Sequence, residues 1–133
     1  MQAFAQDISR REVPSIIRNT FQNEFPKAKD TEWEKAGEDY KVEFEIGFWN
    51  DDHTAWYNQE GKLVKHQKEI AKKELPTPIH TLLNEQYRWF LITDATQITT
   101  DDQTTYKVEL KSFFQEWEVL FSETGAIIEQ WRD

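Results

Sequence analysis

The stretch YKVEFEIGFWNDDHTAWYNQEGKLV, residues 40–64, decides the fold of this chain. Its first seven residues alternate strictly between apolar and charged side chains, which is typical of a β-strand with one buried face. A turn rich in Asn and Asp, a second apolar run at 54–58 and a glycine turn follow before a last short strand at 62–66. The stretch therefore predicts an antiparallel meander.

A similar segment, YKVELKSFFQEWEVLFSETGAII, occurs at residues 106–128. Each segment follows a short strand and, before that, an amphipathic stretch at 13–25 or 75–87 whose apolar residues recur at helical spacing. We therefore predict an α+β fold: a tandem duplication of a helix plus a four-stranded antiparallel meander, with the helices packed on one face of the sheet. The two repeats, 12–70 and 71–133, are expected to form a single compact domain, because no glycine- or serine-rich linker separates them.

The N-terminus, residues 1–11, carries no helical or strand pattern and is expected to be flexible. It contains Ala3-Phe4-Ala5, and small residues at these two positions are what signal peptidase accepts. One interpretation is the remnant of a removed Sec signal peptide, which predicts a periplasmic or secreted protein. The other interpretation is a chance pattern in a flexible start.

Composition excludes several classes of protein. The chain has 133 residues, no cysteine and a formal net charge of −9, so disulfides and thiolate metal sites are excluded and a phosphate backbone would be repelled. No apolar run approaches the roughly 20 residues that cross a bilayer. We expect neither nucleic-acid binding nor membrane insertion.

Several short motifs have the order and spacing of a known family. They are Val13-Pro14 with Ile17, then Phe25-Pro26-Lys27-Ala28 with Trp33-Glu34, then Tyr40 to Phe44, then Glu60-Gly61, and finally Glu69-Ile70 with Leu75-Pro76.

These motifs resemble the PepSY-like family of small exported bacterial proteins, whose fold is similar to that of the beta-lactamase inhibitor protein. The resemblance covers residues 12–131, although the second copy has Tyr87-Arg88 in place of the Phe-Pro pair and lacks the Trp-Glu pair. It implies a double helix-and-meander fold and export, and it implies no established catalytic activity. Related domains are proposed to bind or inhibit peptidases and other enzymes, which is an analogy between folds.

No catalytic motif, cofactor fingerprint or phosphate-binding loop is present in the sequence. The histidines, His53, His66 and His80, lack the spacing of a helical metal pair, and we predict no metal site. The segment NDDH at 50–53 could hold a cation, but Asn and Asp are also the residues that hairpin turns favour. We expect no enzyme and no cofactor.

The aromatic residues point instead to recognition. Trp56 falls on the strand phase opposite the core residues, and exposed aromatic patches on soluble proteins usually mark binding sites. We predict a non-enzymatic binding module, with an enzyme or peptidase inhibitor as one form of it, that uses the outer sheet face and the 48–52 hairpin to hold a protein or peptide. The alternative is a small-ligand or metal-binding periplasmic protein; partner identity and oligomeric state are left open. The predicted contacts are Phe48, Trp49, Asp51, Asp52, Trp56 and Trp131.

Overall fold

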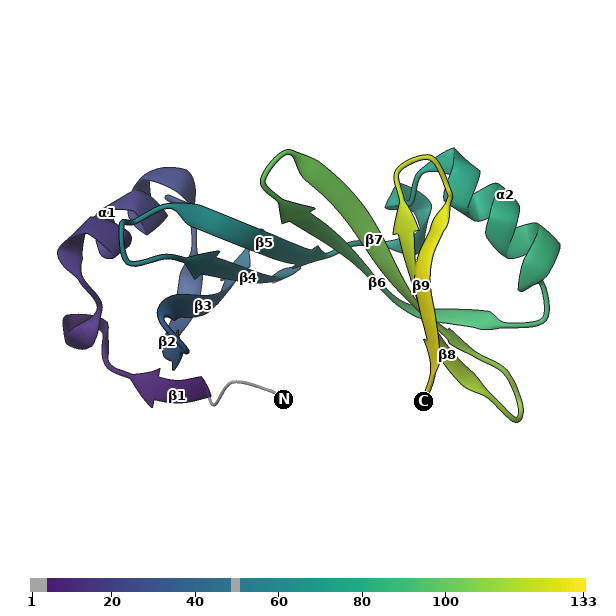
Figure 1. Cartoon of the computed structure of the whole chain (residues 1–133), viewed down its shortest axis with the longest axis horizontal. Helices are drawn as coiled ribbons and strands as arrows, with labels where there is room; N and C mark the ends of the chain where they lie inside the picture. Colours follow the sequence, from purple (N-terminus) through teal and green to yellow (C-terminus); the bar gives the residue numbers. More distant parts are fainter. Residues whose placement is uncertain (1–4, 49–50) are drawn as a thin grey trace. The chain divides into compact units, whose positions relative to one another are not determined.

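The computed structural model describes residues 5–48 and 51–133, and its contacts divide the chain into two compact units, Met1–Lys68 and Glu69–Asp133 (Figure 1). The predicted hairpin residue Trp49 lies outside the described residues. Each unit carries one helix of ten residues beside antiparallel strands, and each has its own hydrophobic core.

The first unit begins with a strand that the sequence pattern did not reveal. Ala5–Ile8 forms β1 and pairs antiparallel with β2, so that Ile8 lies opposite Trp33. A 3₁₀ turn at Arg10–Glu12 then leads into helix α1 at Ser15–Glu24, whose N-cap is Pro14. The remaining strands are β2 (Lys29–Ala36), β3 (Asp39–Ile46), β4 (Asp51–Tyr57) and β5 (Leu63–Glu69).

Helix α1 covers one face of these strands. Its buried residues Ile17 and Phe21 pack with Val42 and other apolar side chains of β2, β3 and β4. The ring of Phe21 meets the ring of Phe44 edge to face, with centroids 5.0 Å apart, and meets Trp33 at 5.3 Å. Aromatic contacts of this geometry add to the free energy gained by burying apolar surface.

The second unit has the same kind of core. A 3₁₀ turn at Lys72–Glu74 precedes helix α2 at Thr77–Gln86, and buried Ile79 and Leu83 pack against strand residues such as Val108 and Phe121. Its strands are β6 (Leu91–Thr100), β7 (Gln103–Lys111), β8 (Glu116–Ser122) and β9 (Ile127–Arg132).

Glycine sets the tight turn before the last strand of each unit. Gly61 and Gly125 have φ angles of +85° and +89°, which side chains with a Cβ rarely adopt. A Cβ on Gly125 would also lie 3.0 Å from the Cβ and the carbonyl oxygen of Pro78 at the start of α2. The turn therefore closes directly against the helix.

The predicted fold class, a duplicated helix plus four-stranded meander, is wrong. In the described residues, the strands form one nine-stranded antiparallel sheet in the order β1 to β9, accompanied by two short α-helices. A four-stranded meander has two open edges whose backbone groups are ready to pair, and the periodicity of a sequence does not show what pairs with them. Residues 1–11, expected to be flexible, include β1 and the first two residues of the 3₁₀ turn, Arg10 and Arg11.

Candidate binding surface

Strand alternation divides the side chains of the first unit between two faces. Val42, Phe44 and Ala55 are buried under α1, so Lys41, Glu43 and Trp56 point to the opposite face, here called the outer face. In this unit no helix packs on the outer face within the described residues. The outer face is therefore the broad surface through which this unit can meet another molecule.

Trp56 lies on the outer face between two lysines. Register places Lys41 and Lys65 on the strands to either side of Trp56, and their ammonium nitrogens lie 5.9 Å and 4.7 Å from the centroid of its ring. The ring attracts both cations, and the lysine stems shield part of its apolar surface, which leaves the side chain half-buried. Trp56 is thus presented toward solvent in a fixed position.

Carboxylates gather beside Trp56. Glu32 of β2 lies opposite Glu43 of β3, which lies opposite Thr54 of β4. The ammonium group of Lys41 lies between the carboxylates of Glu34 and Glu43, at 3.7 Å and 3.2 Å. Its single positive charge therefore balances only part of their combined negative charge. A hollow of about 430 Å³ opens here, and it is lined by Asp30, Glu32, Glu43, Phe44, Glu45, Asp52, His53 and Thr54.

The ladder between β2 and β3 is irregular at this hollow. Its register shifts between Lys29 and Glu32, and Asp30 takes a φ of +53°, which is uncommon outside glycine. The shift brings Asp30 to Glu45, and a hydrogen bond with Asp30 raises the pKa of Glu45; burial and the charges of Asp30 and Asp52 act in the same direction. Negative charge is therefore concentrated at this hollow, around Asp30, Glu45 and Asp52.

The structure brings together some of the predicted contact residues and separates others. Asp52 and Trp56 share the outer face, since Asp52 lies opposite Glu45, whereas Asp51 lies opposite Ile46 on the helix-covered side. Phe48 is 89% exposed. Trp131 belongs to β9 of the second unit, where it lies opposite Glu118 of β8. The assignment of these residues to a partner stays a prediction.

Two surface features of the protein were not predicted from the sequence. Asp30 lies at the β2 irregularity, which no sequence period indicates, and Glu32 lies beside it, opposite Glu43. In the second unit, Phe113 and Phe114 form the tip of the β7–β8 hairpin and are 94% and 86% exposed. The sequence pair Phe-Phe between two strands was the available signal, because adjacent residues of a strand cannot both face the core.

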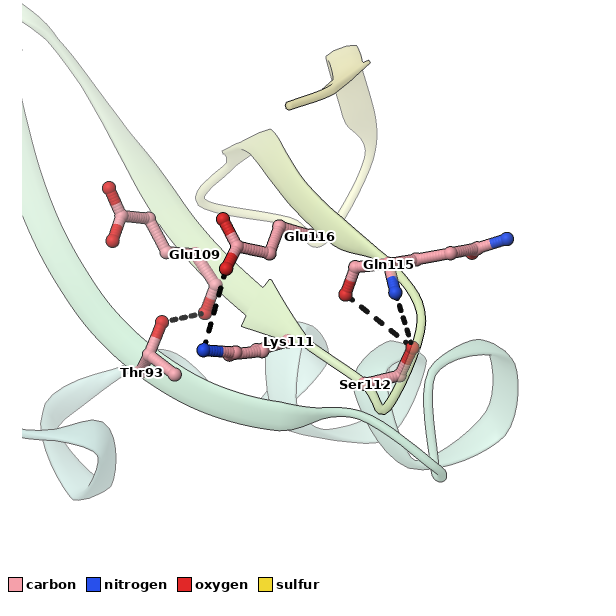
Figure 2. Close-up of polar contacts among 6 residues, drawn as sticks. All are labelled: Thr93, Glu109, Lys111, Ser112, Gln115 and Glu116. Atoms are coloured by element: carbon pink, nitrogen blue, oxygen red, sulfur yellow. Dashed lines mark hydrogen bonds and ion pairs between the residues drawn. The ribbon is translucent and has the colours of Figure 1, made fainter.

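Polar contacts hold that hairpin tip in place (Figure 2). The Ser112 hydroxyl donates to the carbonyl oxygen of Gln115, at 3.5 Å, and accepts from the Gln115 N–H, at 3.2 Å. The backbone N–H of Ser112 also donates to that carbonyl oxygen, at 2.8 Å. Next to the tip, Lys111 pairs with Glu116 at 3.5 Å, and the Thr93 hydroxyl donates to the Glu109 carbonyl oxygen. The two phenylalanines are therefore presented by an ordered turn.

Two further findings concern metals and membranes. In residues 5–48 and 51–133, no group of three or more His, Asp or Glu side chains is placed to hold a metal ion. Among the described helices, none has the length and apolar character needed to cross a membrane.

The comparison with protein families decides the identity of the chain. A model of candidate beta-lactamase-inhibitor-like, PepSY-like proteins matches residues 2–48 and 43–129. The chain belongs to the PepSY-like family. No curated protein matches it in sequence.

Solved structures with the same fold come from Bacteroides. A DUF2874 family protein from Bacteroides uniformis superposes with a TM-score of 0.80 at 18% identity, covering 90% of this chain and 88% of its own. A BLIP-like protein from Bacteroides fragilis gives 0.76 at 17% identity, covering 90% and 85%. A candidate periplasmic protein from Bacteroides eggerthii gives 0.81 at 14% identity, covering 90% and 88%. At these identities the PepSY-like chain shares the fold with them, and the superpositions say nothing more.

Proposed function

We propose that this PepSY-like protein is an exported, non-enzymatic binding module whose outer face in the first unit holds a protein or peptide with basic side chains. The observation that carries the proposal is the position of Trp56 beside a carboxylate-lined hollow on the face that α1 leaves open. An inhibitor of a peptidase or other enzyme is the form of binding that the family's description suggests.

Charge supports a basic partner. The chain carries a net charge of −9, and Asp30, Glu32, Glu43, Glu45 and Asp52 all line the hollow. A lysine or arginine side chain entering the hollow would pair with carboxylates that otherwise repel one another. The pKa of Glu45 is raised first by its hydrogen bond with Asp30, then by burial, and the charges of Asp30 and Asp52 add to this repulsion.

Trp56 supports an anchored contact. Tryptophan is enriched among the residues that dominate binding energy, and those residues are held rigidly before binding. The lysines on each side of the indole restrict it, so little side-chain entropy would be lost on binding.

The remaining predicted contacts extend this surface in the proposal. The hairpin between β3 and β4 is flanked by Phe48, Asp51 and Asp52. In the sequence, Trp49 follows Phe48. Trp131 would serve as a contact in the second unit.

One consideration supports a binding function over a catalytic one, and a second supports a location outside the cytoplasm. Inhibitor-like proteins act by binding, and the carboxylates of this hollow lie on an open sheet face, whereas general acid-base catalysis needs a carboxyl group in a dry pocket. The structural similarity to a candidate periplasmic protein from Bacteroides eggerthii supports a periplasmic or secreted location.

The proposal is tested by titrating the protein with peptides of equal length that are basic, neutral or acidic, each containing one aromatic residue. Calorimetry should show binding of the basic set, weakened by salt. Trp56→Ala should lower the affinity by at least tenfold, and Glu43→Gln with Glu45→Gln by a similar factor.

Glu85→Gln with Glu123→Gln is a matched control, because it removes two exposed carboxylates from α2 and from the turn before β9 in the second unit. Circular dichroism confirms that each variant is folded. Equal binding of all three peptide sets, or unchanged affinity in the Trp56 variant, contradicts the proposal.

A further inference from the structure

His53 of β4 and His66 of β5 meet in the first unit. His53 Nδ1 lies 3.0 Å from His66 Nε2, whereas the ring centroids are 5.2 Å apart and the ring planes differ by 13°. The ring planes are nearly parallel, and the nearest nitrogens are much closer to each other than the ring centroids are. The two rings therefore meet edge to edge, almost in one plane. The two nitrogens therefore point at each other nearly in line.

Aromatic side chains enclose the pair. The Phe44 ring of β3 lies 5.2 Å from His53 at an angle of 19°, and Phe25, which caps α1, lies 5.0 Å from His66. Burial lowers the pKa of both imidazoles, that of His66 to about 4, and the neighbouring Lys68 acts in the same direction. Both rings are therefore neutral at pH 7, the state in which imidazole binds metals.

We propose that His53 and His66 form a two-nitrogen binding site for a monovalent copper ion, Cu(I). Imidazole nitrogen suits copper, and a filled d shell lets Cu(I) accept two ligands in a line, as these two nitrogens are arranged. Zinc requires about four ligands, and in the described parts of the chain no third His, Asp or Glu joins a metal-binding group. The chain has no cysteine, so no thiolate competes for the ion.

Binding of the ion keeps the proton count unchanged. One of the two facing nitrogens now carries the hydrogen that forms the bond between the rings, and the other accepts it. On binding, the donor ring loses this hydrogen to water and takes one up at its other nitrogen. Both facing nitrogens then donate lone pairs to Cu(I), and each ring keeps one N–H.

The site must widen to admit the ion. Two metal–nitrogen bonds of roughly 2 Å each require about 4 Å between the nitrogens, so the rings must separate by about 1 Å. Both side chains are only half-buried, and small side-chain rotations supply this movement. Asp51, Asp52 and Lys68 are the charged groups that act on this pair.

The experiment is an anaerobic titration of the purified chain with Cu(I) against a chromophoric chelator, repeated with Ag(I) and followed by NMR of the imidazole signals. Wild type should bind one equivalent and shift the signals of His53 and His66. His53→Gln and His66→Gln should each weaken binding by at least tenfold. His80→Gln is the matched control, since His80 lies on α2 in the second unit and should leave the affinity unchanged.

Circular dichroism identifies a variant that has lost its fold, and the wild-type NMR shifts test the site without any substitution. No stoichiometric binding by wild type, imidazole signals of His53 and His66 that do not move, or folded variants that bind as tightly as wild type would each overturn the proposal. Equal affinity for Zn(II) at the same pair would overturn the assignment to Cu(I). The His66→Gln variant separates this test from the peptide test, because His66, unlike His53, does not line the hollow.

Discussion

The hydroxyl of Tyr57 donates a hydrogen bond of 3.1 Å to the carboxylate of Glu24, which joins the buried face of β4 to the last turn of α1. The Tyr57 ring is fully buried, so the bond satisfies the polar atom at the end of a side chain surrounded by apolar groups. Burial raises the pKa of Tyr57, and the charge of Glu24 and the hydrogen bond raise it further. The hydroxyl therefore remains a donor at every physiological pH.

Tyr57→Phe is expected to lower the free energy of unfolding by about 1 kcal/mol, because it removes the hydrogen bond but keeps the ring. Urea unfolding of wild type, Tyr57→Phe, Glu24→Gln and the double variant measures the coupling between the two side chains. If the effects of the single substitutions simply add in the double variant, the bond contributes nothing of its own.

Acid is expected to destabilise the protein through the histidine pair. The folded-state pKa of His66 is lowered to about 4 from an ordinary 6.5, and that of His53 is also lowered. The unfolded chain therefore binds these protons first, so this contribution to stability is present above pH 6.5 and is lost as pH falls toward 4.

Urea unfolding at pH 7 and pH 5 should differ by on the order of 1 kcal/mol more in wild type than in His66→Gln, after allowance for solvent screening of a half-exposed ring. The comparison with the variant removes the contribution of carboxyl groups that titrate in the same range. Identical pH dependence in both proteins would contradict the lowered pKa.

Gly125→Ala is expected to be more destabilising than Gly47→Ala by about 1 kcal/mol or more. The two glycines have φ angles of +89° and +92°, so backbone strain is the same. A Cβ at Gly125 meets backbone and side-chain atoms of Pro78 at 3.0 Å, whereas a Cβ at Gly47 meets no atom of the described, non-adjacent residues within 4 Å. Thermal unfolding of both variants separates steric overlap from backbone strain, and equal losses would show that strain alone decides.

Phe114→Ser is expected to change the free energy of unfolding by less than ~0.5 kcal/mol, because its ring is 86% exposed. Phe121→Ala, at a fully buried position of β8, should cost about 3–5 kcal/mol. If both Phe113 and Phe114 are replaced by serine, binding of a hydrophobic dye to the native protein should fall. A large loss of stability in Phe114→Ser would show that the hairpin tip is buried in solution.

Local patterns in the sequence determined the helices and most strands of this protein. The predicted helices at 13–25 and 75–87 became α1 at Ser15–Glu24 and α2 at Thr77–Gln86, since Pro14 and Pro76 precede each helix and periodicity of 3.6 residues needs no distant information. Alternation likewise placed Trp56 opposite the buried residues of β3 and β4.

Only the tertiary structure decided the pairing of edges and the meeting of side chains from different strands. The segment Ala5–Ile8 is too short to show an alternation of apolar and polar side chains. Its pairing with β2, and the nine-stranded order of the sheet, were therefore not predictable from the sequence. The approach of Asp30 to Glu45, and of His53 to His66, depends on register shifts and on diagonal neighbours across strands. A sequence period fixes which face a side chain takes, but the hydrogen-bond register between strands fixes which side chain it meets.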